Sequence, residues 1–477
     1  MGGGLSVVLD LGKTLSKLSL LDESGAMLAR RTRPNDPVTA TIGRARIRVL
    51  DAAGIESWVR GVLREFAGLG HVMRIIPVAH GAAAAIVRAG MLAAPPLDYE
   101  QPIPADLAEA YRAQRDPFAH TGSPALADGL NLGLQLHFLE RLDPALLTGD
   151  AAILPWPQYW AWRFSGVAAA EVTSLGCHSD LWCAASGRPS ALATRRGWAA
   201  RLAPLRGAGE AIGTISAAWS SETGLPTDTA VHCGLHDSNA ALLAARGFDV
   251  IAGHEATVLS TGTWFVAMRT PGKNARVDLA GLPEARDCLV NVDVHGAPIP
   301  SARFMGGREI ELLTGTEAHR IDNSPDQPAI IAALRDMVAA GAMVLPTRTP
   351  GVGPFPDGAS RWINRPATSI ELRATVCLYA ALVADAAFGL IGTRDRVLVE
   401  GRFGEAAAFV RSLATLRPDL DIFVSSRHHD VSYGALRLID PKLAPPPAPT
   451  RVESLDVDLA GYAARWRARA VNSSEAA

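Results

Sequence analysis

The sequence has few cysteines and almost no excess of one charge. Its five cysteines lie scattered along 477 residues, and an odd, dispersed set argues against a disulfide framework. Cys177, His178 and Cys183 lie close together, but their spacing matches no metal-binding pattern. Residues 428–430 (HHD) are similarly better interpreted as a solvated loop than as a ligand cluster. The net charge of −2 gives no electrostatic support for binding nucleic acid or an anionic membrane surface.

The chain also lacks a cationic N-terminal segment followed by an apolar one, so no signal peptide is predicted. Its most apolar long stretch, residues 374–392, contains Asp385 and is expected to form a buried helix rather than a membrane span. A hydrophobic fraction of 48% over 477 residues predicts two or three domains with sizeable cores. We therefore expect a cytoplasmic protein without a membrane partner.

Two strand-turn motifs are present, one in each half of the chain. The first covers residues 7–14 (VVLDLGKT), and the second covers residues 258–264 (VLSTGTW). In each, an apolar strand runs into a turn where glycine lets backbone N–H groups approach a polyphosphate and hydroxyls supply further donors. Asp10 adds a carboxylate suited to Mg²⁺. Either motif alone fits an ordinary turn, but the pair predicts a duplicated domain that closes around a nucleotide.

Periodicity and turn residues predict alternating strands and helices in both halves, which is typical of an α/β fold. In the first half we expect strands over 5–11, 17–21, 26–32 and 73–79, helices over 55–66 and 130–142, an irregular stretch at 93–120, and core packing of the aromatic segment 159–164. In the second half we expect strands over 229–233, 396–400 and 421–424, helices over 238–245, 370–390 and 406–416, and a long loop over 345–366.

Two common nucleotide motifs are missing. Residues 12–14 (GKT) resemble the end of a Walker A loop, but Val7 stands where that pattern needs a glycine. A strand, rather than the long helix of a Walker A loop, is expected to follow. No G-x-G-x-x-G segment follows a predicted strand either. The phosphate chemistry therefore belongs to a different architecture.

The order of motifs along residues 5–440 resembles that of the FGGY carbohydrate kinases, in the actin-like ATPase superfamily. The segments that carry the resemblance are residues 10–14 (DLGKT), 80–85 (HGAAAA), 154–166 (LPWPQYWAWRFSG), 171–174 (EVTS), 234–238 (GLHDS), 260–263 (STGT), 400–404 (EGRFG) and 433–435 (YGA). Within the family, the Gly-Lys-Thr turn and the His-Gly-Ala stretch are most similar to rhamnulokinase- and fuculokinase-like members.

The resemblance implies an α/β protein with two actin-like (ribonuclease H-like) domains and a central interdomain cleft. Residues 1–238 would bind sugar and carry the first phosphate motif, residues 239–440 would bind nucleotide, and residues 441–477 would form a partly helical tail. The implied activity is phosphorylation of a hydroxyl of a small ketose or deoxyketose, with ATP and Mg²⁺ as cofactors. A homodimer stays open. Two alternatives also stay open: a kinase of another pentulose or polyol (xylulose, ribulose, glycerol), and an actin-like nucleotide-binding protein that does not catalyse transfer.

The resemblance also implies roles for individual residues. Asp237 would remove the proton of the acceptor hydroxyl, with a helix N-cap as its alternative role. Asp10 would organise Mg²⁺. The residues expected to bind the nucleotide are Gly12, Lys13, Thr14, Ser260, Thr261, Gly262, Thr263, Gly401, Arg402 and Gly404. The residues expected to contact the sugar are His80, Gly81, Glu171, His236 and Trp264. For Glu171 a hydrogen bond within the protein is the alternative, and for Trp264 packing in the core.

The sequence departs from the family pattern in a few places. Arg402 and Phe403 stand where small residues are usual in the adenosine motif, so bulk there could narrow the base pocket, or Arg402 could stack on the purine. Lys13 replaces a more common threonine. Gln158 replaces an aspartate, which we interpret as the loss of a surface cap. None of these changes removes the base or the metal carboxylate, so an active enzyme is expected.

Overall fold

The computed structural model describes residues 4–273, 275–315, 326–425, 431–443 and 447–474. The chain forms two compact units, each built from discontinuous segments. The first unit comprises Met1–Gly247, Val290–Pro298 and His429–Pro445, and the second comprises Phe248–Leu289, Ile299–His428 and Pro446–Ala477. The division of sugar and nucleotide binding between residues 1–238 and 239–440 stays a prediction. The segment 428–430 lies outside the described residues.

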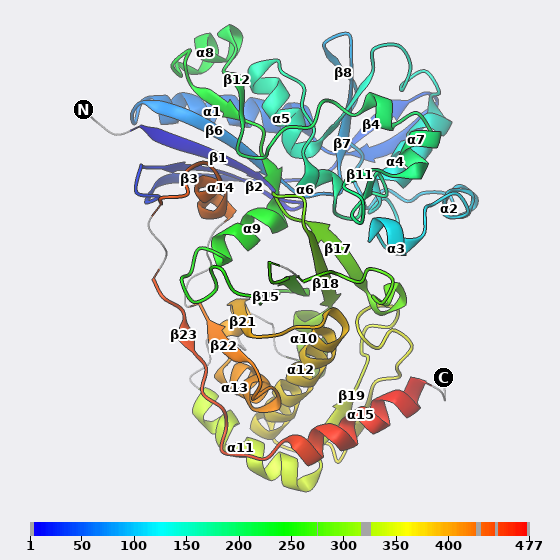
Figure 1. Ribbon diagram of the computed structural model, residues 1–477, viewed down its shortest axis with the longest axis vertical. Coiled ribbons are helices and arrows are strands. Elements are labelled where there is room, and N and C mark those ends of the chain that lie inside the picture. Colours follow the sequence, from blue (N-terminus) through cyan, green and yellow to red (C-terminus); the bar gives the residue numbers. More distant parts are fainter. Residues whose placement is uncertain (1–3, 274, 316–325, 426–430, 444–446, 475–477) are drawn as a thin grey trace. The chain divides into compact units, whose positions relative to one another are not determined.

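The first unit is built on a mixed sheet. Its strands are β1 (Leu5–Leu11), β2 (Leu15–Leu21), β3 (Met27–Pro34), β6 (Val72–Ala79), β12 (Ala211–Thr214) and β13 (Ala230–His232), in the order β12-β13-β6-β1-β2-β3. β1, β2 and β3 form an antiparallel meander, as predicted, and β6 runs parallel to β1 (Figure 1). The short strand β14 (Leu235–His236) also pairs with β6 in parallel. The carboxyl ends of β1, β6 and β14 therefore meet at one edge of this sheet.

Four helices of this unit pack close to the sheet. They are α1 (Ala52–Ala67), α5 (Trp156–Ser165), α9 (Asp237–Ala245) and α14 (Val431–Ile439). Trp156, Trp160 and Phe164 on α5 are buried, which confirms the predicted core role of the aromatic segment. α9 and α14 lie side by side against the sheet (Figure 1), and Ala240 and Leu436 join its buried residues in one core cluster.

Gly434 is the small residue of α14 that lies against the backbone of α9. A Cβ at this position would lie 1.8 Å from the carbonyl oxygen of Ala240 on α9, closer than any real contact. Glycine therefore lets the two helix backbones approach each other. The segment 433–435, near the end of the chain, thus holds the helix that begins at Asp237.

The remaining elements of the first unit include parts that the sequence did not predict. The strands are β4 (Val38–Ile42), β5 (Ala45–Val49), β7 (Ala84–Arg88), β8 (Met91–Ala94), β9 (Ala152–Pro155), β10 (Trp182–Cys183) and β11 (Arg188–Pro189). The helices are α2 (Ala105–Arg112), α3 (Phe118–Thr121), α4 (Leu132–Leu142), α6 (Val172–Leu175), α7 (Ala191–Arg195) and α8 (Ala217–Thr223). The irregular stretch predicted at 93–120 is therefore partly wrong, because α2 forms there and buries Ala108 and Tyr111.

The second unit is built on another mixed sheet. This sheet contains β15 (Ala256–Thr261), β16 (Phe265–Thr270), β17 (Cys288–Val292), β18 (Pro298–Phe304), β21 (Arg396–Gly401), β22 (Asp421–Val424) and β23 (Thr450–Arg451), in the order β17-β18-β16-β15-β21-β22-β23. Residues 290–292 of β17 fall in the Val290–Pro298 segment of the first unit. β15 and β16 form an antiparallel hairpin, and β21 runs parallel to β15. The second phosphate-type turn therefore lies at the tip of the hairpin, next to the end of β21.

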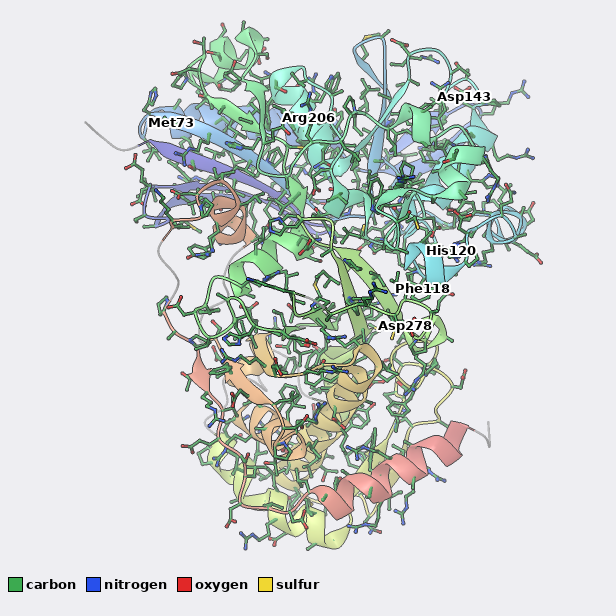
Figure 2. All side chains as sticks on the ribbon, viewed as in Figure 1. Met73, Phe118, His120, Asp143, Arg206 and Asp278 are labelled. Carbon is green, nitrogen blue, oxygen red and sulfur yellow. The ribbon has the colours of Figure 1, made fainter. Side chains whose placement is uncertain are left out.

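The helices of the second unit are α10 (Gly306–Thr314), α11 (Gln327–Ala340), α12 (Ser369–Ile391), α13 (Ala407–Leu416) and α15 (Ala460–Ser474). Among the described residues, α12 is the one helix long and apolar enough to span a membrane, and 78% of its most apolar window is buried inside the protein. This burial confirms the predicted core helix. The loop predicted at 345–366 begins and ends in a small hairpin, β19 (Met343–Leu345) and β20 (Arg361–Ile363). The side chains that fill both units are drawn in Figure 2.

Candidate active site

Asp237 lies at the sheet edge of the first unit, at the start of α9. The N-cap residue of α9 is His236, so Asp237 does not act as the helix cap that the sequence left open. Asp237 Oδ1 accepts a hydrogen bond from the Ser238 N–H at 2.6 Å, and the Asp237 side chain remains 27% exposed. The surrounding protein raises the pKa of Asp237 above its ordinary value, mainly by desolvation. A partly accessible carboxylate with a raised pKa is well suited to accept a proton.

Asp10 lies near the end of β1, and its carboxylate is almost fully buried. Lys17, its neighbour on β2, donates to Asp10 Oδ2 at 3.0 Å. Burial raises the pKa of Asp10, Lys17 counteracts that rise, and the charge of Asp237 adds to it. The two carboxylates therefore act on each other electrostatically at the same edge of the sheet.

Two buried histidines accompany these carboxylates. Burial lowers the pKa of His80 to about 3, with nearby His236 as the second cause, and burial lowers the pKa of His236 to about 4. Both imidazoles are therefore uncharged at neutral pH. His236 Nε2 lies 3.2 Å from Asp237 Oδ1, while Nδ1 of each ring is buried and has no hydrogen-bond partner among the described residues. A neutral imidazole has one donor and one acceptor nitrogen, so a ring with an unpartnered nitrogen keeps the capacity to hydrogen-bond a hydroxyl group.

Gly81 lets this cluster form. A Cβ on Gly81 would lie 2.5 Å from Cys177 Sγ and 3.1 Å from His236 Nε2. Burial raises the pKa of the Cys177 thiol to about 12, so the thiol fills space here rather than acting as a nucleophile. The predicted sugar contact of Gly81 stays a prediction, but its close packing against His236 explains the glycine.

A small pocket lies beside the first phosphate-type turn. Lys13 Nζ forms an ion pair with Asp98, lies 3.5 Å from Glu100 Oε2, and stands 4.7 Å from the centroid of the Tyr99 ring. The predicted phosphate contact of Lys13 stays a prediction, since this cation already has anionic partners in the pocket wall. The residues lining the pocket include Gly12, Lys13, Asn35, Asp51, His80 and Trp156.

Gln158 and Glu171 have different surroundings from those expected. Gln158 is fully buried, and its Nε2 donates to the carbonyl oxygens of Cys233 at 3.3 Å and Gly234 at 3.0 Å, so the interpretation as a lost surface cap is wrong. Glu171 is also fully buried and serves as the N-cap of α6. Of the two roles that the sequence left open for Glu171, this position favours hydrogen bonding within the protein.

In the second unit, the turn after β15 has free space beside the Cα atom of its half-buried glycine. The Gly262 N–H donates to the Trp264 carbonyl oxygen at 3.0 Å, and the nearest atom to a Cβ on Gly262 would be 3.7 Å away. Thr263 is exposed and Ser260 is half-buried. Because the Gly262 N–H is engaged within the turn, the hydroxyls of Ser260 and Thr263 are the groups here that are suited to donate to a phosphate. The Trp264 ring has the guanidinium of Arg303 4.9 Å from its centroid.

The segment 400–404 lies beside that turn. Gly401 has φ of +90°, and a Cβ there would lie 2.2 Å from the Thr261 carbonyl oxygen. The Thr261 hydroxyl donates to the Glu400 carbonyl oxygen at 2.6 Å and accepts from the Phe403 N–H at 3.0 Å. Phe403 is 1% exposed, and its ring packs in the core with Phe265, so it does not project toward a base pocket. Arg402 is exposed, Gly404 is buried, and their predicted nucleotide contacts stay predictions.

Comparison with known proteins decides the family. Residues 253–447 match the family profile described as "Carbohydrate kinase FGGY, C-terminal domain". The crystal structure of a carbohydrate kinase from Novosphingobium aromaticivorans is 55% identical, with a TM-score of 0.94 over 99% of this chain and 100% of that chain. The chain belongs to the FGGY carbohydrate kinase family. None of the curated proteins matches the sequence.

More distant solved structures share the fold of this kinase. A gluconate kinase from Lactobacillus acidophilus is 12% identical, with a TM-score of 0.75 over 99% of this chain and 97% of that chain. A glycerol kinase from Plasmodium falciparum with ADP is 12% identical, with a TM-score of 0.78 over 99% of each chain. A xylulose kinase from Rhodospirillum rubrum is 16% identical, with a TM-score of 0.74 over 99% of this chain and 98% of that chain. The predicted two-domain, actin-like α/β fold and the prediction of an enzyme are confirmed.

The residues of the kinase are compatible with Mg²⁺ and ATP. No group of three or more His, Cys, Asp or Glu side chains in the described part of the chain could hold a metal ion alone. This fits Mg²⁺, which usually binds through one or two carboxylates, several waters and substrate phosphates. Burial and the charge of Asp237 raise the pKa of Asp10, which means that they disfavour its ionised form. A nearby cation would stabilise the ionised carboxylate. Thr263, which is exposed next to Gly262, can donate its hydroxyl proton to a phosphate oxygen.

Sequence reasoning missed two charged residues of the kinase. Lys17 was treated only as a strand residue, although its spacing from Asp10 across a predicted hairpin could have indicated the pair. Glu400 was included only as part of a motif. It is 7% exposed, burial raises its pKa to about 8, and its Oε1 has no hydrogen-bond partner among the described residues. No sequence signal distinguishes such a glutamate from an exposed one.

Proposed function

We propose that this FGGY kinase transfers the γ-phosphoryl group of ATP to a hydroxyl of a small ketose or deoxyketose, similar to L-rhamnulose or L-fuculose. The main support is the arrangement of Asp237, a partly exposed carboxylate, beside two uncharged histidines whose buried Nδ1 atoms have no hydrogen-bond partner among the described residues. A carboxylate can accept the proton of the attacking hydroxyl, and the imidazoles can orient neighbouring hydroxyls. We expect the reaction to take place in the cytoplasm and the kinase to form a homodimer.

In this proposal Asp237 is the general base. His80 and His236 bind sugar hydroxyls. Gly81, which follows β6, allows the backbone to approach the His236 ring closely. Trp264 contributes a further sugar contact. Glu171 was predicted to be a sugar contact too, but its complete burial supports an internal role instead.

Asp10 would hold Mg²⁺, and Lys17 would keep the Asp10 carboxylate ionised. Bound Mg²⁺ supplies neutralisation of the phosphate charge. The nucleotide contacts of this proposal come from the two phosphate turns and the segment after β21: Gly12, Lys13, Thr14, Ser260, Thr261, Gly262, Thr263, Gly401, Arg402 and Gly404. The exposure of the hydroxyl residues Thr14 and Thr263 supports these roles, together with the free space beside the Gly262 Cα atom.

A pentulose or polyol is the second candidate substrate. It is favoured by the names of structural relatives, which include a xylulose kinase and a glycerol kinase. These relatives are 16% and 12% identical to this kinase, so their substrates are candidates for testing and not assignments.

The test is ATP consumption by the purified kinase with Mg²⁺ against a panel of ketoses, aldoses and polyols. Wild type and Asp237→Asn are measured in parallel, since the amide preserves size but cannot accept the proton. We expect turnover with one sugar class and a loss of about 10²–10⁴-fold in kcat for the variant. Wild-type rates in Asp237→Asn would contradict the assigned base. Turnover only with glycerol or a pentulose would select the second candidate.

A further inference from the structure

The turn that carries Asp237 is held from two directions by buried side chains. From α5, Gln158 donates to the carbonyl oxygens of Cys233 and Gly234. From α6, the Thr173 hydroxyl accepts a hydrogen bond from the backbone N–H of His236 at 3.0 Å. The second contact is one peptide unit from Asp237. It is therefore a side-chain hydrogen bond that acts on the backbone leading into Asp237, whereas the Ser238 hydroxyl and the His236 ring approach the Asp237 carboxylate itself.

The Thr173 hydroxyl is itself held in place by the carboxyl group of Glu171. Its O–H donates to Glu171 Oε2 at 2.6 Å, and the Thr173 N–H donates to Glu171 Oε1 at 2.9 Å. The Ser174 N–H adds a third hydrogen bond to Glu171 Oε2 at 3.1 Å. Because the Thr173 proton points at Glu171, an oxygen lone pair is left to face His236. The rotation of the hydroxyl is thus determined by the carboxylate.

We propose that Glu171 and Thr173 are positioning residues, which fix the peptide between Leu235 and His236, directly before Asp237, so that the Asp237 carboxylate faces the acceptor hydroxyl. This inference rests on the proposed role of Asp237 as the base. It assigns to the segment 171–174 a function that needs no contact with the sugar.

The burial of Glu171 supports a specific role. Glu171 is completely buried, and burial raises its pKa to about 7. Burying an ionisable side chain costs free energy, so a residue that only filled space here would be apolar. Thr173 and Ser174 are also almost fully buried. A cap of a four-residue helix could be made by an exposed serine or asparagine. What the buried carboxylate adds is a strong, oriented acceptor for the Thr173 hydroxyl.

The decisive variant is Thr173→Val, which keeps the shape of the side chain but removes the hydroxyl. We expect kcat to fall about 10- to 100-fold, because small misplacements of a catalytic group cost rates of this order. The KM value for ATP should change by less than about threefold, since none of the proposed nucleotide contacts is touched by Thr173. Thr173→Ser, which retains the hydroxyl, should restore most of kcat. Glu171→Gln should reproduce a large part of the defect.

Ser174→Ala is the matched control. Its hydroxyl also approaches Glu171 Oε2, at 3.3 Å, but it makes no contact with the turn at His236 in the described structure. We expect Ser174→Ala to keep kcat within about twofold of wild type. Thermal unfolding of every variant separates loss of fold from loss of rate. If Thr173→Val does not fold, the comparison of Thr173→Ser with Glu171→Gln still tests the pair.

The outcomes separate this inference from the proposed function. Thr173→Val with wild-type kcat, beside an inactive Asp237→Asn, would overturn the positioning role alone. The same holds if Thr173→Ser is as defective as Thr173→Val, because the hydroxyl would then be irrelevant. Equal losses in Thr173→Val and Ser174→Ala, in proportion to lost stability, would indicate a merely structural role and overturn the inference. An active Asp237→Asn would instead remove the base on which the inference rests.

Discussion

Replacing Glu400 by glutamine should stabilise the kinase, and by an amount that depends on pH. Burial raises the pKa of the Glu400 carboxyl from 4.5 to about 8, and no charged partner counteracts that rise. Between these values the folded state keeps a proton that the unfolded chain releases, so a rise in pH destabilises the native protein. At neutral pH the cost is roughly 3 kcal/mol, from 1.36 kcal/mol for each unit between 4.5 and neutral. Glutamine has a similar shape and carries no such cost.

The assay is urea unfolding of wild type and Glu400→Gln at about pH 5 and about pH 8. The variant should gain roughly 3 kcal/mol more over wild type at the higher pH than at the lower. Glu405→Gln, an exposed position on the same segment, serves as the control and should shift neither curve. Because the chain has two units, the transition that includes β21 must be followed separately. Parallel pH dependences of wild type and Glu400→Gln would refute the reasoning.

Two further substitutions test the close approaches that glycine permits. Gly81→Ala places a methyl group 2.5 Å from Cys177 Sγ, so kcat/KM for the sugar should fall about tenfold or more. Adding Cys177→Ala should restore part of kcat/KM. A double variant without any such rescue would contradict the packing argument. Gly434→Ala places a methyl group 1.8 Å from the Ala240 carbonyl oxygen and should cost about 1–3 kcal/mol in thermal unfolding, whereas Gly389→Ala, with open space around it, should be neutral or slightly stabilising.

The sequence predicted the regular elements because their signals are local. The strand over 5–11 and the helix over 55–66 have apolar residues at the spacing that their own geometry demands, and both elements form within a few residues of the predicted bounds. α2 was missed since it is short, begins after Pro104, and lies in a stretch rich in proline. Its stability comes from Tyr111, whose hydroxyl donates to Asp180 at 2.7 Å, a contact far away in the sequence.

The family motifs located the candidate site, but the side-chain surroundings within it were harder to predict. Phe403 was interpreted as bulk that could narrow the base pocket, because small residues are usual at this place in the family's adenosine motif. The structure buries its ring beside Phe265, on the core side of the backbone. Phe403 lies in a short 3₁₀ helix, Arg402–Glu405, after β21, and Gly401 with φ of +90° redirects the chain just before it. The alternation of a strand therefore does not predict which side Phe403 faces.

Gln158 shows how a departure from a family pattern can follow from local chemistry. The pattern has an aspartate at this position, and an ionised carboxylate can only accept hydrogen bonds. In this kinase the partners are two carbonyl oxygens, those of Cys233 and Gly234, which also only accept. An aspartate could make such a contact only if protonated, whereas the amide N–H₂ of glutamine donates to both without any proton uptake. Because Gly234 also approaches the Pro77 carbonyl so closely that a Cβ would lie 2.1 Å away, the turn has little freedom to present other groups. The glutamine is therefore matched to the backbone that carries Asp237.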